Sequence, residues 1–172
     1  MRGRPAESRI CWLRRKSTDD ASAHVAEHSL EVQLPFLQRT AGKFSFVPIS
    51  IGVGGYAALE ALGHGLAKSI QKASRPVLIV ASSDMNHYEP DAQTRVKDHK
   101  AIAQILALKP ADLYEVIRRE DISMCGYGPA IAMLVAATDL GAQHTELVKY
   151  ATSADTSGDY SSVVGYAGII VS

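Results

Sequence analysis

The strongest constraint on the fold is one stretch, Pro76–Tyr88, in which an apolar run ends abruptly in small polar residues, an acid and a histidine. The run contains β-branched side chains, as a buried parallel strand usually does. In open α/β sheets, the site lies beyond the carboxyl ends of the strands. We therefore expect a central strand at residues 76–82 that delivers Asp84 and His87 to the rim of the sheet. The alternative is a strand followed by a polar turn without chemistry.

Helical and strand patterns alternate on both sides of this stretch. This alternation predicts an α/β fold, layered α/β/α with a mixed sheet. We find no repeats and no internal boundary after residue 24. The first expected helix begins near Glu27 and should kink or restart at Pro35. Further helices are expected at Leu59–Ile70, from Asp91 onward, at Pro110–Arg119 and at Ala130–Leu140. The expected strands are Phe44–Ile49, 76–82, Glu146–Thr152 and Val163–Val171.

Two of the predicted helices have a predicted packing face. In the helix after Asp91, the residues Val96, His99, Ile102 and Leu106 share one face at helical spacing. The helix over Ala130–Leu140 is rich in small residues, so we expect it to pack closely on a sheet.

Charge is distributed unevenly, although the formal net charge of the 172 residues is zero. Met1–Lys16 holds six basic residues against one acid, a net +5, which leaves −5 for the remainder. We expect residues 1–23 to be a basic, disordered leader and residues 24–172 to be the folded domain. A nucleic-acid arm or a transit peptide is the alternative for the leader. The balanced total predicts no nucleic-acid partner, and no apolar run is long enough for a secretory signal or a membrane span.

Three residues are candidates for chemistry. His87 can transfer protons near neutral pH, and Asp84 could orient it or a bound water. Cys125 lies in a glycine-containing turn before a predicted helix, and a helix N-terminus stabilises the thiolate that ligates metals. The alternatives are a hydrogen-bonded loop histidine and a small buried cysteine. With Cys11 in an unlike context, no disulfide framework is indicated, which favours a reducing, cytoplasmic setting.

Other catalytic patterns are weaker. His24-Val25-Ala26-Glu27-His28 matches the pattern of inverted zinc peptidases, but no acidic third ligand stands out. A Ser83-Asp84-His87 hydrolytic triad lacks the Gly-x-Ser-x-Gly elbow. The sequence has no phosphate-binding loop and no complete dinucleotide fingerprint.

Four blocks in the same order give a resemblance to a known family. Ser82–Tyr88 resembles the Ser-Ser-Asp-x-x-His-aromatic signature of the Memo family, whose bacterial and archaeal members are called AmmeMemoRadiSam system protein B. Glu27–Phe36 is similar to its Glu-His-Ser segment, and Cys125–Pro129 to its Cys-Gly-x-x-Pro turn. Tyr150–Asp155 and Val163–Gly168 resemble its closing strands. The resemblance covers roughly residues 24 to 172.

The resemblance implies a fold similar to that of class III extradiol dioxygenases, with His87 in the active-site-like pocket. It implies that Cys125 is the third ligand of a two-histidine, one-cysteine site for iron or copper. The family motifs Pro-His-Ala-Gly-Tyr and Pro-Ser-His, which carry the two histidines, do not occur here. We therefore expect a fold truncated at its N-terminal side and impaired metal-linked redox activity. Cys125 and His87 alone should bind no metal tightly.

The resemblance also leaves other functions open. The chain could be a non-enzymatic module that binds proteins or phosphopeptides, or an inactive gene fragment. By resemblance, the expected partners are a radical S-adenosylmethionine protein and an AMMECR-type protein. An open sheet edge would also favour self-association.

Overall fold

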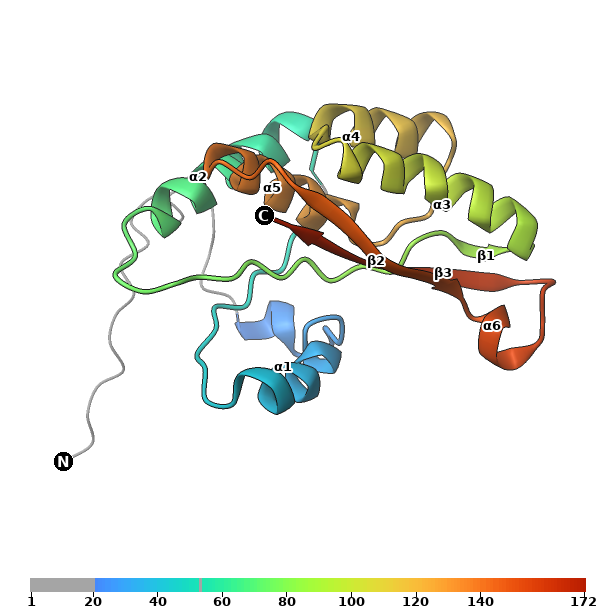
Figure 1. Cartoon of the computed structure of the whole chain (residues 1–172), viewed down its shortest axis with the longest axis horizontal. Coiled ribbons are helices and arrows are strands. Elements are labelled where there is room, and N and C mark those ends of the chain that lie inside the picture. The colour runs from blue at the N-terminus through green and yellow to red at the C-terminus, as the bar shows by residue number, and fades with distance from the viewer. Residues whose placement is uncertain (1–20, 53) are drawn as a thin grey trace.

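The computed structural model describes residues 21–52 and 54–172, an arrangement of helices around a small sheet (Figure 1). The predicted leader therefore lies almost wholly outside the described residues, and its disorder stays a prediction. The described elements are the short 3-10 helices η2 (Ala21–His24) and η3 (Glu31–Gln33), the helices α1 (Leu34–Ala41), α2 (Tyr56–Ile70), α3 (Asp91–Leu106), α4 (Pro110–Arg119), α5 (Tyr127–Asp139) and α6 (Ala154–Ser157), and the strands β1 (His87–Glu89), β2 (Thr145–Thr152) and β3 (Val163–Val171).

The sheet has the strand order β1-β3-β2, and both of its pairings are antiparallel. Tyr166 lies opposite Ala151, and Gly168 lies opposite Lys149. The predicted α/β class is confirmed. The expectation of a mixed sheet is wrong for the described strands, because β2 and β3 follow one another as a hairpin with only the short α6 between them.

The expected central strand is the main correction. Residues 76–82 and 44–49 belong to no strand in the described structure. The side chains of Val77, Leu78 and Val80 are 50%, 77% and 42% exposed. An apolar run becomes a buried strand only if a neighbouring backbone satisfies its N–H and C=O groups and other elements cover its side chains. Neither condition is met among the described residues.

The core lies between α3, α4 and α5, where Ile102, Leu113, Ile131 and Leu134 are fully buried. Our predicted face for α3 is partly wrong, because Val96 is 57% exposed and His99 is also exposed. The helix instead buries Thr94 and Asp98 above Ala101, Ile102 and Ile105. Hydropathy does not predict burial of these two polar residues. They can be buried because hydrogen bonds inside the protein satisfy their polar groups.

The small residues of α5 pack against a helix and not, as expected, against a sheet. α2 crosses α5 at Gly63, where an added Cβ would lie 2.6 Å from Cβ of Val135 and 2.7 Å from the carbonyl oxygen of Ala132. Glycine at this position therefore sets the close approach of the two helices.

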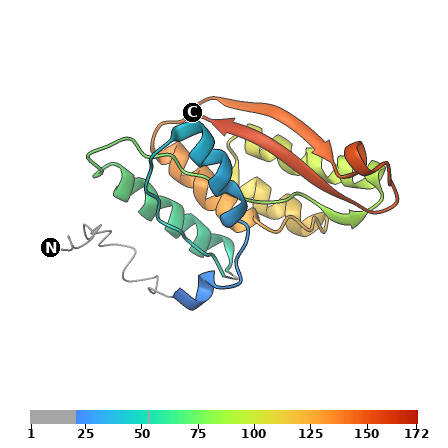
Figure 2. The ribbon, with the colours of Figure 1, turned by 90° about the horizontal axis from the view of Figure 1, so that it is seen from below.

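α1 lies on the other side of the sheet from α3 and α4 (Figure 1), and the view from below shows it in front of α5 (Figure 2). Pro35 occupies the first turn of α1, directly after η3, so the expected restart of the helix at this proline is confirmed. Gln33 donates a hydrogen bond of 3.2 Å to Ser82, which ties this layer to the segment before β1. None of the described helices combines the length and the apolar character that crossing a membrane requires.

Candidate metal centre

Three potential ligand residues from two distant segments meet at one place. One nitrogen of His87, one carboxylate oxygen of Asp84 and the sulfur of Cys125 all lie within 4.8 Å of one another. His87 Nε2 is 3.7 Å from Asp84 Oδ2. We call this group the Asp84–His87–Cys125 cluster. The structure thus brings together all three residues that the sequence singled out, and in the described part of the chain no other such group of three occurs.

Backbone hydrogen bonds fix one segment of the cluster to the sheet and join the two segments to each other. Residues 85 and 86 are fixed to β3, because Met85 N–H donates to Gly165 and Gly165 N–H donates to the carbonyl of Asn86. Across the cluster, the Gly126 N–H donates to Ser83 Oγ over 2.8 Å. A Cβ at Gly126 would collide with the Ser82 carbonyl and the Ser83 side chain. Glycine is therefore required for the loop before α5 to touch the segment before β1.

The sulfur of Cys125 faces this same backbone. Asp84 N–H points at Sγ over 3.3 Å, and Ser83 Oγ lies 3.9 Å from it. Cys125 is exposed, and it precedes the first residue of the long helix α5 by one glycine. Cys125 is therefore open to solvent, while the Asp84 N–H fixes the position of its sulfur.

His87 is oriented by a single residue. Its Nδ1 donates to the backbone carbonyl of Ser123 over 2.6 Å, and its main-chain N–H donates to Ser123 Oγ over 2.7 Å. A carbonyl oxygen can only accept, so Nδ1 carries the proton and Nε2 bears the lone pair of the neutral ring. Nε2 is the atom that faces Asp84. The arrangement is that of a metal-ligating histidine held by its other ring nitrogen.

Behind His87 lies a buried polar network that the sequence analysis missed. Asn86, 1% exposed, accepts hydrogen bonds at Oδ1 from both the N–H and the hydroxyl of Ser123, each 3.0 Å long. The Asn86 N–H donates to Asp98 Oδ1 over 2.8 Å, and the hydroxyl of Tyr150 donates to Asp98 Oδ2 over 2.7 Å. These bonds connect β2, α3 and the loop before α5 to the position of His87.

Asp98 is a buried carboxyl at the centre of this network. Burial raises its pKa, and the hydrogen bonds from Tyr150 and Asn86 offset only part of that effect. Burial and the bond to Asp98 likewise raise the pKa of Tyr150. Gly165 makes room for the carboxyl, since a Cβ there would overlap Asp98 Oδ2. A signal was present in the sequence: Thr94 and Asp98 are one helical turn apart, on the face that continues through Ile102.

The backbone beside His87 is strained. Tyr88 has φ +60°, a value that side-chain-bearing residues rarely adopt, and its side chain is 79% exposed. Its ring centroid lies 5.6 Å from that of His87. The exposed aromatic ring is thus held next to the cluster.

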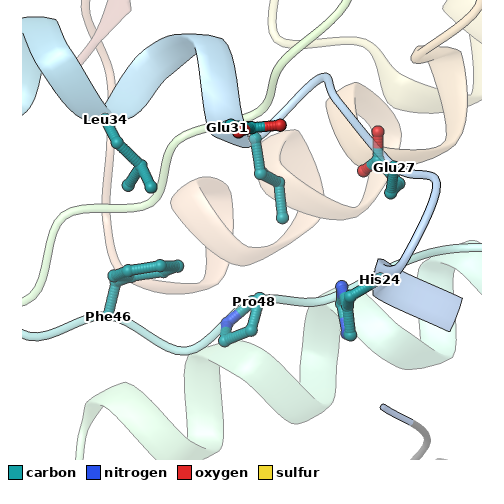
Figure 3. A pocket seen from close by; sticks show the side chains of 7 residues that line it. His24, Glu27, Glu31, Leu34, Phe46 and Pro48 are labelled. Atoms are coloured by element: carbon teal, nitrogen blue, oxygen red, sulfur yellow. The ribbon is translucent and has the colours of Figure 1, made fainter. Parts of the chain in front are cut away.

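The histidine pattern near residue 24 forms no comparable site. His28 pairs with Glu31 over 3.1 Å, while the Glu27 carboxylate accepts from the N–H and hydroxyl of Ser29. The Ser29 N–H lowers the pKa of Glu27. Figure 3 shows the nearby cavity of about 180 Å³, in which Leu34 and Phe46 face the same space. No member of the Asp84–His87–Cys125 cluster lines it.

Ser83 is not placed as a hydrolytic nucleophile. Its hydroxyl donates to the carbonyl of Asp84 over 2.6 Å and accepts from Gly126, so it is engaged by the backbone and not by His87. This geometry agrees with the absence of the nucleophile-elbow motif.

Comparison with known proteins gives one consistent result. The family model described as Memo-like protein matches residues 8–170. The chain is 46% identical over 153 residues to a MEMO1 family protein of Methanopyrus kandleri, covering 88% of this chain and 54% of that protein. It is 45% identical over 165 residues to one of Methanocaldococcus jannaschii, covering 93% and 58%. One from Sulfolobus acidocaldarius is 43% identical over 151 residues, covering 87% and 53%.

The extent of these matches has two consequences. The family match starts at residue 8, so it includes part of residues 1–23, the stretch that we expected to be a basic, disordered leader. The chain spans about half the length of the curated relatives it matches. Any activity, substrate or partner of the full-length relatives is therefore only a proposal for this chain.

Proposed function

Because the chain belongs to the Memo-like protein family, we propose that it is a metal-binding protein whose first-row transition metal is held by Asp84, His87 and Cys125. The observation that carries this proposal is the approach of the three ligand atoms to within 4.8 Å of one another. A spacing of this size lets three side chains reach one ion after small rotamer adjustments.

The chemistry of the donors fits such an ion. Imidazole and thiolate favour iron, copper and zinc over calcium or magnesium, and the carboxylate adds a negative charge. Bound iron or copper would supply one-electron redox chemistry of the kind expected for a relative of the extradiol dioxygenases. The side chain of Asp84 is 50% exposed and that of His87 is 16% exposed, so one side of the cluster opens to solvent.

The residues of the chain have distinct roles in this proposal. Ser123 and Asn86 hold His87 so that Nε2 faces the ion position. Cys125 supplies the thiolate. Asp84 is the more exposed carboxylate, and it can either ligate the ion or accept a proton from a bound molecule.

The structure changes the ligand count on which our sequence-based expectation of weak binding rested. That expectation counted Cys125 and His87 only. Asp84, which we had assigned to orienting His87 or a water, adds a third donor atom at the same place. Three protein ligands are the usual number for an open transition-metal site. We therefore expect binding of about one metal ion per chain.

The test is anaerobic titration of the purified chain with cobalt(II), followed by iron(II) and copper(I) in competition with a chelator. Cobalt bound to a thiolate gives a ligand-to-metal absorption in the near ultraviolet, which reports Cys125 directly. The substitutions Cys125→Ser, His87→Ala and Asp84→Asn should each weaken binding by at least about tenfold.

The matched control is Cys11→Ser, because Cys11 is the other cysteine of the chain. This variant should keep both the stoichiometry and the absorption. Circular dichroism melting curves establish that each variant is folded. Retention of the cobalt–thiolate absorption by folded Cys125→Ser, or its loss in Cys11→Ser, would refute the proposed site.

A further inference from the structure

A second cavity adjoins the Asp84–His87–Cys125 cluster. It has a volume of about 330 Å³ and is lined by Asp84 and by residues of strands β2 and β3. This volume lies at the lower end of the range for small-molecule sites. Its polar side chains come from three places: Gln33 at the end of η3, Ser83 and Asp84 in the segment before β1, and Lys149 and Tyr166 on the strands.

The strand register explains why these side chains face the same space. Lys149 pairs with Gly168, and Ala151 pairs with Tyr166. Alternate residues of a strand lie on one face, and paired residues share that face. Lys149 and Tyr166 therefore stand on the same surface, with Ala151 and Gly168 as a floor of small residues between them. Tyr150, which lies between Lys149 and Ala151, points to the opposite face and packs against the core.

The two charged residues of the cavity lie at different points along β3, because Asp84 directly precedes Met85, which bonds to Gly165, whereas Lys149 pairs with Gly168. Lys149 makes no ion pair with any residue in 21–52 or 54–172, so its ammonium is available to a ligand. The carboxylate of Asp84 lies toward the cluster. A ligand with one negative charge would be attracted to Lys149 and repelled from Asp84, which gives it one orientation.

The shape favours a flat apolar body between these two charged groups. Tyr166, 44% exposed, offers an aromatic side chain, and the small residues Ala151 and Gly168 leave room over the strands. An aromatic ring gains from offset stacking on such a side chain. Phosphate-binding sites usually combine arginines or several backbone N–H groups at a helix N-terminus, whereas this cavity offers one lysine.

We propose that this cavity binds a small planar monocarboxylate, with its carboxylate on Lys149, its ring against Tyr166 and its far end directed at the cluster. The inference rests on the proposed function, since the cluster would act on that far end. It names the class of molecule that the metal centre would receive.

The test uses sodium benzoate as the probe and the full chain without metal. Saturation-transfer NMR and calorimetric titration should show saturable binding. Lys149→Gln should weaken the affinity for benzoate at least about tenfold, and Tyr166→Ala should also weaken it. Asp84→Asn should strengthen it, because the repulsion at the far end is removed. Lys68→Gln on α2 is the matched control and should bind benzoate like the unmodified chain.

Three further probes define the chemistry. Benzamide has the ring without the charge, cyclohexanecarboxylate has the charge without a flat ring, and inorganic phosphate has the charge alone. Each should bind more weakly than benzoate. Equal binding by benzamide or phosphate, no saturable benzoate binding, or unchanged affinity in Lys149→Gln would overturn the proposal.

The two proposals fail separately. Lys149 is not a member of the cluster, so Lys149→Gln should keep the cobalt–thiolate absorption. Cobalt binding without benzoate binding would refute the carboxylate subsite and leave the metal centre standing. Benzoate binding without cobalt binding would refute the metal centre and establish the cavity as a ligand site on its own.

Discussion

The imidazole of His87 donates from Nδ1 to the main-chain carbonyl of Ser123 over 2.6 Å, although the two residues are 36 positions apart in the sequence. This bond joins the first residue of β1 to the loop before α5, and it fixes which ring nitrogen faces Asp84. Because the acceptor is a main-chain carbonyl, a change of side chain at position 123 does not remove the acceptor atom, although it removes the bonds that the Ser123 hydroxyl makes to the His87 N–H and to Asn86 Oδ1. The position of the acceptor oxygen is set by the backbone conformation of the loop before α5.

The first prediction concerns the tautomer of His87. In the neutral imidazole, the proton should reside on Nδ1, because the Ser123 carbonyl can only accept. Long-range proton–nitrogen NMR correlations of the metal-free chain distinguish the two tautomers directly. Exposed His144 serves as the internal comparison in the same spectrum. A predominantly Nε2-protonated His87 would contradict the orientation on which the metal centre depends.

The second prediction concerns Asn86. Replacing it by alanine removes the acceptor of two hydrogen bonds from Ser123 and leaves buried polar groups unpaired. Asn86→Ala should lower the free energy of unfolding by about 1–3 kcal/mol. If the proposed centre is correct, it should also weaken cobalt binding about 10- to 100-fold. Urea denaturation and metal titration measure the two effects, and exposed Gln143→Ala should change neither.

The third prediction concerns Gly126. Any residue can adopt its φ of −100°, so a substitution there destabilises the chain by steric overlap of the new side chain and not by backbone strain. Gly126→Ala places a methyl group against the Ser82 carbonyl and Ser83, and it should destabilise the chain by about 1–3 kcal/mol. Gly52→Ala meets no atom within 4 Å and is the matched control. Thermal unfolding of the two variants side by side is the measurement; equal melting temperatures would show that the two loops do not touch.

The fourth prediction concerns the pH dependence of stability. Burial raises the pKa of Asp98 above its ordinary value of 3.8, so the folded state holds this proton more tightly than the unfolded state. The contribution of Asp98 to stability is therefore greatest below the unfolded pKa and is lost as pH rises through the folded pKa. Asp98→Asn does not ionise, and its amide can accept from the Asn86 N–H at Oδ1 while Nδ2 donates to the hydroxyl oxygen of Tyr150. Its stability relative to the unmodified chain should rise with pH across this window and then level off.

The measurement is the free energy of unfolding in urea from about pH 4 to about pH 8 for both chains. Tyr150→Phe removes the hydroxyl that donates to Asp98 Oδ2 and so raises the folded pKa of Asp98 further, which should extend the loss of stability to higher pH and make the total loss larger. A difference between Asp98→Asn and the unmodified chain that does not vary with pH would show that Asp98 titrates alike in the folded and unfolded states.

The sequence was most informative where residue chemistry is distinctive. Asp84, His87 and Cys125 were predicted to lie in one pocket, and they do lie together, although the strand at residues 76–82 that was expected to deliver Asp84 and His87 is not formed in the described structure. Their roles in binding or catalysis stay predictions. The helix α4 and the strands β2 and β3 could also be predicted, because proline at a first helical turn and runs of strand-forming residues are local signals.

The rest depended on contacts between distant residues. No local pattern shows that Asn86 bonds Ser123, or that Asp98 bonds Tyr150 from another element. Asp98 was also hidden by its polarity, since hydropathy places acids on the surface. The prediction for Val77–Val80 was wrong in the opposite direction: its apolar residues predicted burial, yet Val77, Leu78 and Val80 are exposed in the described structure. Burial depends on what covers a segment as well as on its composition.

That exposed run has a thermodynamic consequence. Val77, Leu78 and Val80 continue without interruption into Asp84 and His87, and their backbone groups belong to no strand in the described structure. Any strand that paired with this run, from a second copy or from another protein, would restrict the backbone up to the cluster. Association and ligand binding would then form one linked cycle, in which each shifts the other's equilibrium constant by the same factor. Occupancy of the centre would vary with protein concentration by mass action, without any change in the three ligands.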